Sequence, residues 1–322
     1  MTVIVGQGEF KYEALEVWPI LPKDINLLET PGVAVNSLDL VHVFSRNTEH
    51  PVMIFDRHGN FKNGFGKGIF SNRTHGIFIG PDDNIFCVDD GIHTITKFSS
   101  SGELLMTIGT PGISSKKWSG KPFNKPTHAA VSQNTGDIFI TDGYGNFSVH
   151  KYSGDGKYIK SWGEAGIDQG QFVRPHNIAV DENDRVLVAD REAHRVQIFD
   201  SEGTVLDIWN NIYMPNGLTI GPDKNIYIGE LNSEEMFVDP VPHGLGHRVS
   251  ILSPSGELLC RFGHPEEGED PGKFIAPHGI CVDSYGDIYV GEVSYTIRGS
   301  KMNPPKELRS LSKLKKIVRD KC

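Results

Sequence analysis

Three histidines occupy the same position in three alternating sequence repeats, and together their side chains could bind a metal ion. His75 lies in Thr-His-Gly-Ile, His176 in Pro-His-Asn-Ile and His278 in Pro-His-Gly-Ile. If the repeats surround an axis, alternate repeats bring the three imidazoles together at about 120° from one another. Three neutral nitrogen ligands with a fourth position open are the usual arrangement of a catalytic zinc ion.

A fourth histidine stands at the equivalent position of a further repeat. His128 begins that repeat, whereas Asn216 takes the same place two repeats later. Imidazole nitrogen is a ligand for zinc and also for iron, copper or nickel. The pattern therefore favours a transition metal site over a merely polar rim, with His128 as an additional candidate residue.

The histidines belong to six similar sequence units. Each unit alternates apolar and polar residues, which is typical of half-buried β-strands. Turns rich in Asp, Asn and Gly divide each unit, and such turns suit hairpins. Four strands in a unit of about 40–50 residues, repeated six times, predict an all-β fold, the six-bladed β-propeller. The units begin near Gly32, His75, His128, His176, Asn216 and His278.

The two ends of the chain complete this organisation. We expect residues 1–300 to form the propeller, with the N-terminal run 12–18 supplying the outer strand that the last blade lacks. Residues 301–322 form a basic tail whose apolar spacing predicts a C-terminal amphipathic helix. That helix would dock on the propeller or on a partner subunit, and self-association would then run through it. The apolar residues at i, i+3 spacing are Leu308, Leu311, Leu314 and Ile317.

Composition and charge exclude several classes of partner. The net charge of −9 argues against nucleic acid, because phosphate binding requires a basic face. No apolar stretch approaches the roughly 18–20 residues that cross a bilayer, and the N-terminus shows no basic and apolar leader. The four cysteines have no CxxC spacing, which favours buried free thiols. We therefore expect a cytoplasmic protein without a membrane span.

Two further residues at the same mouth of the propeller could take part in chemistry. Tyr144 and Arg191 follow the second strand of the third and fourth units. A tyrosine beside a metal can transfer a proton, and a guanidinium can hold a carboxylate through two parallel hydrogen bonds. On the residues alone, Tyr144 could equally pack with its hydroxyl in a surface hydrogen bond. Arg191 could equally form a salt bridge between blades.

Taken together, these motifs resemble a known family. The repeats match the NHL-type propeller pattern, and roughly residues 40–297 are similar to the peptidyl-α-hydroxyglycine α-amidating lyase family, whose core is a six-bladed propeller. The specific segments are the three histidine motifs, Asp-Gly-Tyr-Gly-Asn at 142–146 and Ala-Asp-Arg-Glu at 189–192. Generic NHL repeats share only the weaker Gly-x-Phe and Asp-x-x-x-x-Arg-Val elements.

The resemblance implies a set of site residues and a reaction. The family's zinc ligands match His75, His176 and His278, its catalytic tyrosine matches Tyr144, and its active-site arginines match Arg191 and Arg46. The implied reaction is the cleavage of a carbinolamide, N–CH(OH)–COO⁻. The metal acts as a Lewis acid on the hydroxyl oxygen, a base takes the hydroxyl proton, and the C–N bond breaks. The products are an amide and a glyoxylate-like aldehyde.

Three positions depart from the family pattern. Gly279 stands where the family has an aspartate associated with a structural calcium, so the resemblance does not extend to Ca²⁺. Gly145 stands where the family has a cysteine, which fits a cytoplasmic version. His128 replaces the family's usual aspartate and could be a ligand, a proton relay or a substrate contact. A small N-hydroxyalkyl amide or amine is therefore as good a substrate candidate as a peptide.

Three functions are compatible with these residues. The first is a zinc-dependent lyase of the amidating type, acting on a small-molecule or peptide substrate with a carboxylate. The second is a hydrolase, in which the same three histidines hold a metal that activates water against an ester, lactone or amide. The third is a non-enzymatic NHL propeller that serves as a binding scaffold, because propellers host all three activities.

Overall fold

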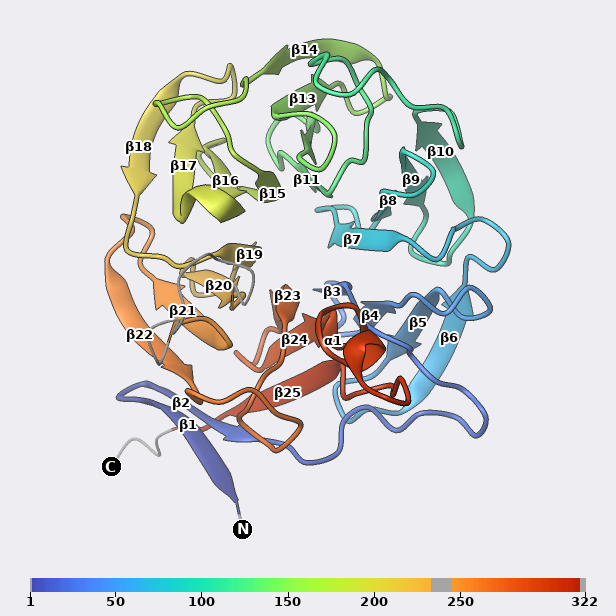
Figure 1. Ribbon diagram of the computed structural model, residues 1–322, viewed down its shortest axis with the longest axis vertical. Helices are drawn as coiled ribbons and strands as arrows, with labels where there is room; N and C mark the ends of the chain where they lie inside the picture. Colours follow the sequence, from blue (N-terminus) through green and yellow to red (C-terminus); the bar gives the residue numbers. More distant parts are fainter. Residues whose placement is uncertain (1, 233–244, 319–322) are drawn as a thin grey trace.

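Six antiparallel sheets surround a central axis like the blades of a propeller (Figure 1). The structure is a computed structural model that describes residues 2–232 and 245–318. Five sheets have four strands and the sixth has five. The predicted all-β, six-bladed propeller is confirmed.

The first three blades follow one another along the chain. The strands of each blade are given from the axis outwards. Blade 1 contains β3 (Gly32–Val35), β4 (Val41–Phe44), β5 (Val52–Phe55) and β6 (Phe61–Phe65). Blade 2 contains β7 (Thr74–Ile79), β8 (Ile85–Asp89), β9 (Thr94–Phe98) and β10 (Leu104–Ile108). Blade 3 contains β11 (His128–Val131), β12 (Ile138–Asp142), β13 (Ser148–Tyr152) and β14 (Tyr158–Trp162).

The last three blades continue the ring. Blade 4 contains β15 (Pro175–Val180), β16 (Val186–Asp190), β17 (Arg195–Phe199) and β18 (Val205–Trp209), with the 3-10 turn η1 (Arg191–Ala193) after β16. Blade 5 contains β19 (Pro215–Ile220), β20 (Ile226–Glu230), β21 (Arg248–Leu252) and β22 (Leu258–Gly263). Blade 6 contains β23 (Pro277–Val282), β24 (Ile288–Glu292), β25 (Leu311–Lys316), β2 (Phe10–Ala14) and β1 (Val3–Gln7). The helix α1 (Ser294–Ile297) and the turn η2 (Gly299–Lys301) lie between β24 and β25.

The sixth blade joins both ends of the chain. Strand β25 pairs with β24 on one side, where Ile288 lies opposite Leu314, and with β2 on the other, where Tyr12 lies opposite Lys316. The N-terminal strands therefore lie outside the C-terminal strand in one sheet, as the ribbon in Figure 1 shows.

The prediction of a helix over the tail 301–322 is wrong for the segment 311–316, which forms β25. Leucines three residues apart share a face in a helix, but they face opposite sides of a strand. Leu314 packs with Tyr12 in the core next to blade 5, whereas Leu311 packs with Trp18 in the core next to blade 1. The spacing thus reflects a strand buried on both faces, and the helical surface expected for self-association is not formed there. The short helix near the C-terminus is α1.

The core lies between the blades. Each blade is an antiparallel sheet that packs against a neighbouring blade on each face, so nearly all residues of its middle strands are buried, for example in β12, β13, β16 and β17. Between blades 3 and 4, for example, Phe139 and Val149 pack against Val188 and Phe199, and all four are fully buried. This packing fixes the inner strands, and with them the side chains at the axis.

The cysteines agree with the sequence expectation as far as the structure describes the chain. Cys87, Cys260 and Cys281 are buried free thiols, and Cys322 lies outside the described residues. Among residues 2–232 and 245–318, no helix is long and apolar enough to cross a membrane.

A buried histidine in blade 1 makes the folded state sensitive to acid. His42 is 1% exposed in β4, and burial lowers its pKa to about 4. The unfolded chain binds this proton near pH 6.5, whereas the folded protein binds it only near pH 4. Stability should therefore fall as the pH drops through this window, by about 1.4 kcal/mol per pH unit for this residue.

Urea denaturation of the wild type and of His42→Leu between pH 7.5 and 4.5 tests this expectation. The unfolding free energy of the variant should depend less steeply on pH. The difference in slope should correspond to about one bound proton, or about 1.4 kcal/mol per pH unit. Equal slopes for the two proteins would show that His42 does not contribute.

Candidate metal centre

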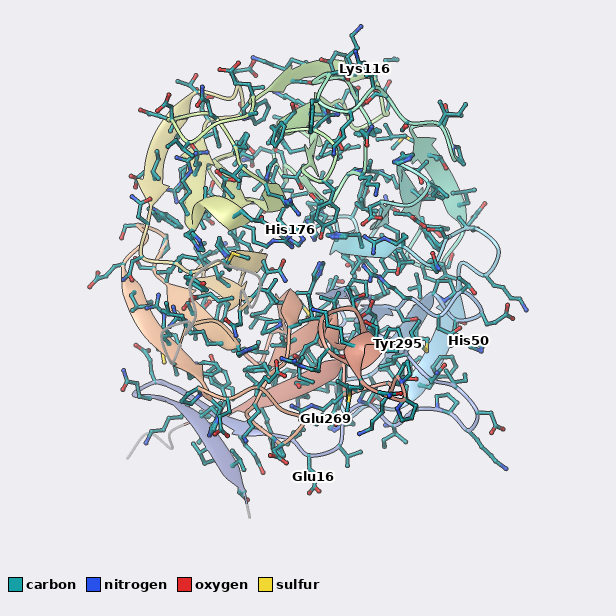
Figure 2. All side chains as sticks on the ribbon, in the orientation of Figure 1. Glu16, His50, Lys116, His176, Glu269 and Tyr295 are labelled. Atoms are coloured by element: carbon teal, nitrogen blue, oxygen red, sulfur yellow. The ribbon has the colours of Figure 1, made fainter. Side chains whose placement is uncertain are left out.

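The three repeat histidines converge on the axis. His75, His176 and His278 are each the second residue of an innermost strand, β7, β15 and β23. Each lies at a shift in the pairing register with the next strand, and such an irregularity re-aims a side chain. Figure 2 labels His176 at the inner end of blade 4, near the central axis of the propeller.

Their geometry fits one metal ion. One ring nitrogen from each histidine lies within 4.8 Å of the others, and the ring centroids are 4.6 to 4.9 Å apart. All three side chains are buried. The alternation seen in the sequence thus becomes a three-fold cluster at one mouth of the channel.

Backbone carbonyls fix the orientation of the three rings. The Nδ1 atoms of His75, His176 and His278 lie 2.6 to 2.7 Å from carbonyl oxygens of the next blade. Because a carbonyl only accepts, each Nδ1–H must donate, which leaves the Nε2 lone pair free to bind a metal. The carbonyls belong to Thr127, Asn216 and Pro31, at the inner edges of blades 3, 5 and 1.

Electrostatics keep these imidazoles neutral. Burial lowers the pKa of all three well below the ordinary value. Positive charge from Arg46 lowers the pKa of His75 and His278 further, and Arg191 does the same for His176. Neutral imidazole is the form that binds a metal, so the site is prepared for a cation without first losing protons.

Tyr144 brings a hydroxyl group to this cluster. Its Oη lies 3.0 Å from Nε2 of His75 and 3.0 Å from Nε2 of His176. Both chain neighbours of Tyr144 are glycines, because the backbone there runs close to the segments that contain Pro175 and Asn124. A Cβ on Gly143 would lie 2.0 Å from the carbonyl oxygen of Pro175, and one on Gly145 would lie 2.1 Å from Asn124. The Gly-Tyr-Gly sequence therefore follows from close backbone contact.

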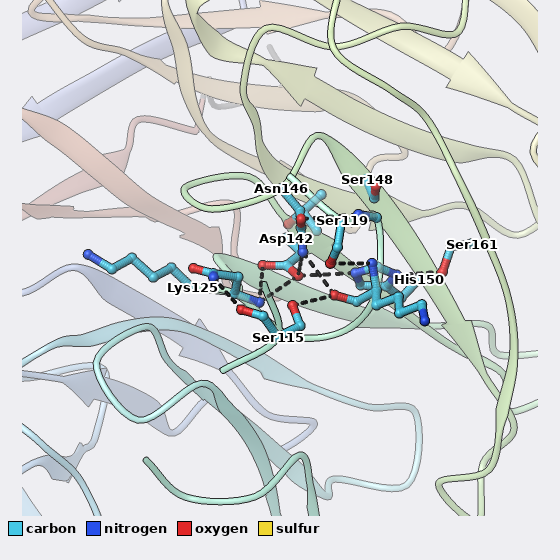
Figure 3. A network of polar contacts seen from close by, with 12 residues as sticks. Ser115, Ser119, Lys125, Asp142, Asn146, Ser148, His150 and Ser161 are labelled. Carbon is cyan, nitrogen blue, oxygen red and sulfur yellow. Dashed lines mark hydrogen bonds and ion pairs between the residues drawn. The ribbon is translucent and has the colours of Figure 1, made fainter. Parts of the chain in front are cut away.

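A buried polar network holds the segment that carries Tyr144 (Figure 3). The Asp142 carboxylate accepts hydrogen bonds from the backbone N–H of Asn124 and from Asn146. It also lies 3.2 Å from Nε2 of His150, whose Nδ1 is 2.6 Å from the Ser161 hydroxyl. Asp142 and His150 are fully buried, so this network anchors the loop on both sides of Tyr144.

The two predicted arginines lie on opposite sides of the mouth. Arg191, in η1 of blade 4, ion-pairs with Glu192 and donates to Asn216. Its burial lowers its pKa, but Tyr144 and Glu192 outweigh that effect and raise the pKa above the ordinary value. Arg46, after β4 in blade 1, ion-pairs with the buried Glu29. The structure thus brings both near the histidines, and each forms an ion pair with a carboxylate.

His128 does not join the three-histidine group. Among the described residues, the group that could hold a metal contains His75, His176 and His278. His128 faces a cavity of about 220 Å³ in the channel beyond them, and burial lowers its pKa to about 4. Its Nδ1 and the Oδ1 of Asn177, which lines the same cavity, are buried without a hydrogen-bond partner in the described chain.

Comparison with known proteins places the chain among its relatives. Residues 172–199 match the family model described as NHL repeat. The chain is 33% identical to the human (Homo sapiens) NHL repeat-containing protein 3 over 279 residues, which cover 81% of this chain and 76% of that protein. It belongs to the NHL-repeat family.

A second curated protein and a solved structure also match. Peptidyl-alpha-hydroxyglycine alpha-amidating lyase 1 of Drosophila melanogaster is 31% identical over 252 residues, which cover 73% of this chain and 45% of that protein. This chain therefore spans less than half of that relative. A solved streptogramin B lyase has a TM-score of 0.58 at 16% identity, covering 92% of this chain and 86% of that one. That likeness shows the fold alone.

Two arginines of this NHL-repeat protein were not singled out from its sequence. Arg73 and Arg174 each stand two residues before a cluster histidine, whereas Ala276 has that place in blade 6. Arg73 binds Asp90 through two nitrogens, at 2.8 and 2.6 Å. The guanidinium of Arg174 lies 5.5 Å from the ring centroid of Tyr144. The shared offset from the histidines is the signal that could have found them.

Proposed function

We propose that the protein is a metal-dependent carbon–nitrogen lyase of the α-amidating type. Its substrate would be an N-acyl or N-alkyl α-hydroxyglycine-like carbinolamide, and its products an amide or amine and a glyoxylate-like aldehyde. The observation that carries the proposal is the Tyr144 hydroxyl, 3.0 Å from Nε2 of both His75 and His176. A proton-transfer group and a set of metal ligands thereby meet at one point.

The donor set fits a zinc ion or another divalent transition metal. Three neutral imidazoles with oriented Nε2 atoms would hold it, with a fourth position open. When bound, the metal would supply Lewis acidity toward the substrate hydroxyl. The proposed ligands are His75, His176 and His278, and calcium is not part of the proposal.

The side chains at the mouth would carry the proton transfer. Tyr144 Oη takes the proton of the substrate hydroxyl as that oxygen becomes the aldehyde carbonyl. The C–N bond breaks, its electron pair goes to nitrogen, and Tyr144 passes the proton it took from the hydroxyl to that nitrogen, which completes the amide. Arg191 and Arg46 supply positive charge that favours a substrate with a carboxylate.

The similarity to a named amidating lyase supports the reaction class. The similarity to NHL repeat-containing protein 3 does not distinguish an enzyme from a scaffold. The experiment must therefore separate three results, namely lyase products, hydrolysis products and no turnover.

Incubation with N-benzoyl-α-hydroxyglycine and product analysis by mass spectrometry provides this test. A lyase yields benzamide and glyoxylate in equal amounts, faster than in a matched sample of heat-inactivated protein. Benzoate would instead indicate that the site hydrolyses the amide. No product above the control from this substrate and from an N-alkyl analogue would refute the lyase proposal.

A further inference from the structure

The two arginines expected to hold the substrate carboxylate already have partners. Arg191 uses Nε and Nη2 on Glu192, and its Nη1 donates to Asn216 at 2.9 Å and to the Tyr144 hydroxyl at 3.4 Å. Arg46 uses Nη1 on Glu29 and Nε on the carbonyl oxygen of Thr74. Each residue is 7% exposed. Both guanidinium groups are therefore engaged and covered, and neither presents a free two-nitrogen edge to a ligand.

Arg174 is placed differently at the same mouth. Its side chain is 39% exposed, and in the described chain its guanidinium makes no hydrogen bond. Its one charged partner is Glu192, which lies 3.3 Å from Nε. The terminal nitrogens of Arg174 are thus free to form a fork with a carboxylate.

Backbone hydrogen bonds on both sides hold the main chain of Arg174 in place. The N–H of Arg174 donates to Asp190 at 2.8 Å, and its carbonyl accepts from the N–H of Arg191 at 3.0 Å. Two residues later in the chain, His176 belongs to the three-histidine group. The Tyr144 ring has Arg174 5.5 Å and Arg191 5.6 Å from its centroid. Arg174 therefore stands beside the tyrosine whose hydroxyl touches two histidines.

The charge balance of this group favours an anion. Glu192 is the acidic partner of both Arg191 and Arg174, so two guanidinium groups share one carboxylate. The other mouth arginines each have a carboxylate of their own, Glu29 for Arg46 and Asp90 for Arg73. One positive charge beside Tyr144 is left without a matching negative charge, which suits a single carboxylate on the ligand.

We propose that Arg174 binds the carboxylate of the substrate directly, while Arg191 holds Tyr144 and shares Glu192 with it. This assignment rests on the proposed function for the choice of an α-hydroxy acid amide as substrate. It adds a specificity-determining residue at the rim and predicts a preference for acids over neutral amides of the same shape.

Binding of a non-reacting probe to the full-length, metal-containing protein tests the assignment. N-benzoylglycine carries the carboxylate but lacks the hydroxyl, and N-benzoylglycinamide is its neutral counterpart. Calorimetry should show tighter binding of the acid by the wild type. Arg174→Gln should weaken binding of the acid by about tenfold or more and leave the amide unchanged. Arg174→Lys should recover part of the loss, because charge remains while the fork is gone.

Arg73→Gln is the matched control, since it removes the equivalent arginine of blade 2, which is already bound to Asp90. It should change neither affinity by more than about twofold. The assignment is overturned if the wild type shows no preference for the acid, if Arg174→Gln binds it normally, or if Arg73→Gln is equally defective. Circular dichroism establishes that both variants are folded. Because the probe does not react, loss of acid binding in Arg174→Gln would support this assignment even in a protein without lyase turnover.

Discussion

Replacing His176 by alanine should abolish the proposed metal binding and leave the propeller folded. The imidazole is one of three converging ligands, and a two-histidine remainder binds a transition metal far more weakly. Loss of an outer partner of a metal ligand already costs roughly 10- to 100-fold in affinity, so loss of a ligand should cost more. The proposed activity on the carbinolamide should fall to background, since the Lewis acid would be lost.

The fold should survive because His176 contributes little to the core between the blades. The substitution removes its hydrogen bond to the Asn216 carbonyl, which costs about 1 kcal/mol. Metal per chain by elemental analysis, together with thermal unfolding, measures both effects. His264→Ala, at an exposed position, is the control and should keep its metal. A His176→Ala protein with a full metal complement would disprove the assignment of this cluster.

Replacing Tyr144 by phenylalanine should have the opposite combination of effects. The metal should remain, because the three imidazole ligands and their carbonyl anchors are untouched. The turnover number should fall by about 10²- to 10⁴-fold, the usual contribution of a positioned proton-transfer group. Substrate affinity should change much less, since the ring that lies beside Arg174 and Arg191 is retained.

Steady-state kinetics and elemental analysis on the same preparation measure this combination. Tyr285→Phe provides the control, because Tyr285 is 58% exposed in a surface turn. A Tyr144→Phe variant with the turnover of the wild type would rule out the proposed proton-transfer role. If that variant instead lost its metal, Tyr144 would have to be treated as part of the metal site.

Much of the fold could be predicted from the sequence because each blade repeats one pattern of strands and turns. The equivalent positions of His75, His176 and His278 then followed from the symmetry of the ring. The tail was mispredicted because Leu311 and Leu314 have a spacing that suits one helix face and also two strand faces. Only the partners of that segment, β24 and β2, decide between the two.

The residue types of the site could be predicted from the sequence, but the hydrogen bonds and ion pairs among them could not. The carbonyls of Thr127, Asn216 and Pro31 orient the histidines, but any residue has a carbonyl, so the sequence has no signal for them. The engagement of Arg191 by Glu192 and the freedom of Arg174 depend on side-chain pairing across a turn. Such pairing appears only once the backbone is placed.

Because the sixth blade contains strands from both ends of the chain, the parts of the site are completed in a fixed order during synthesis. His75 and His176 belong to blades whose strands are all synthesised before residue 210. His278 belongs to the blade that needs β25, and its ring is anchored on Pro31 at the far side of the seam. A nascent chain can therefore complete the blades of His75 and His176 first, but the His176 ring gains its carbonyl partner Asn216 only with blade 5, and His278 is secured only when the last strand has emerged. Metal acquisition would then be among the final events of biosynthesis, and a prematurely terminated chain would be left with an incomplete trap for the ion.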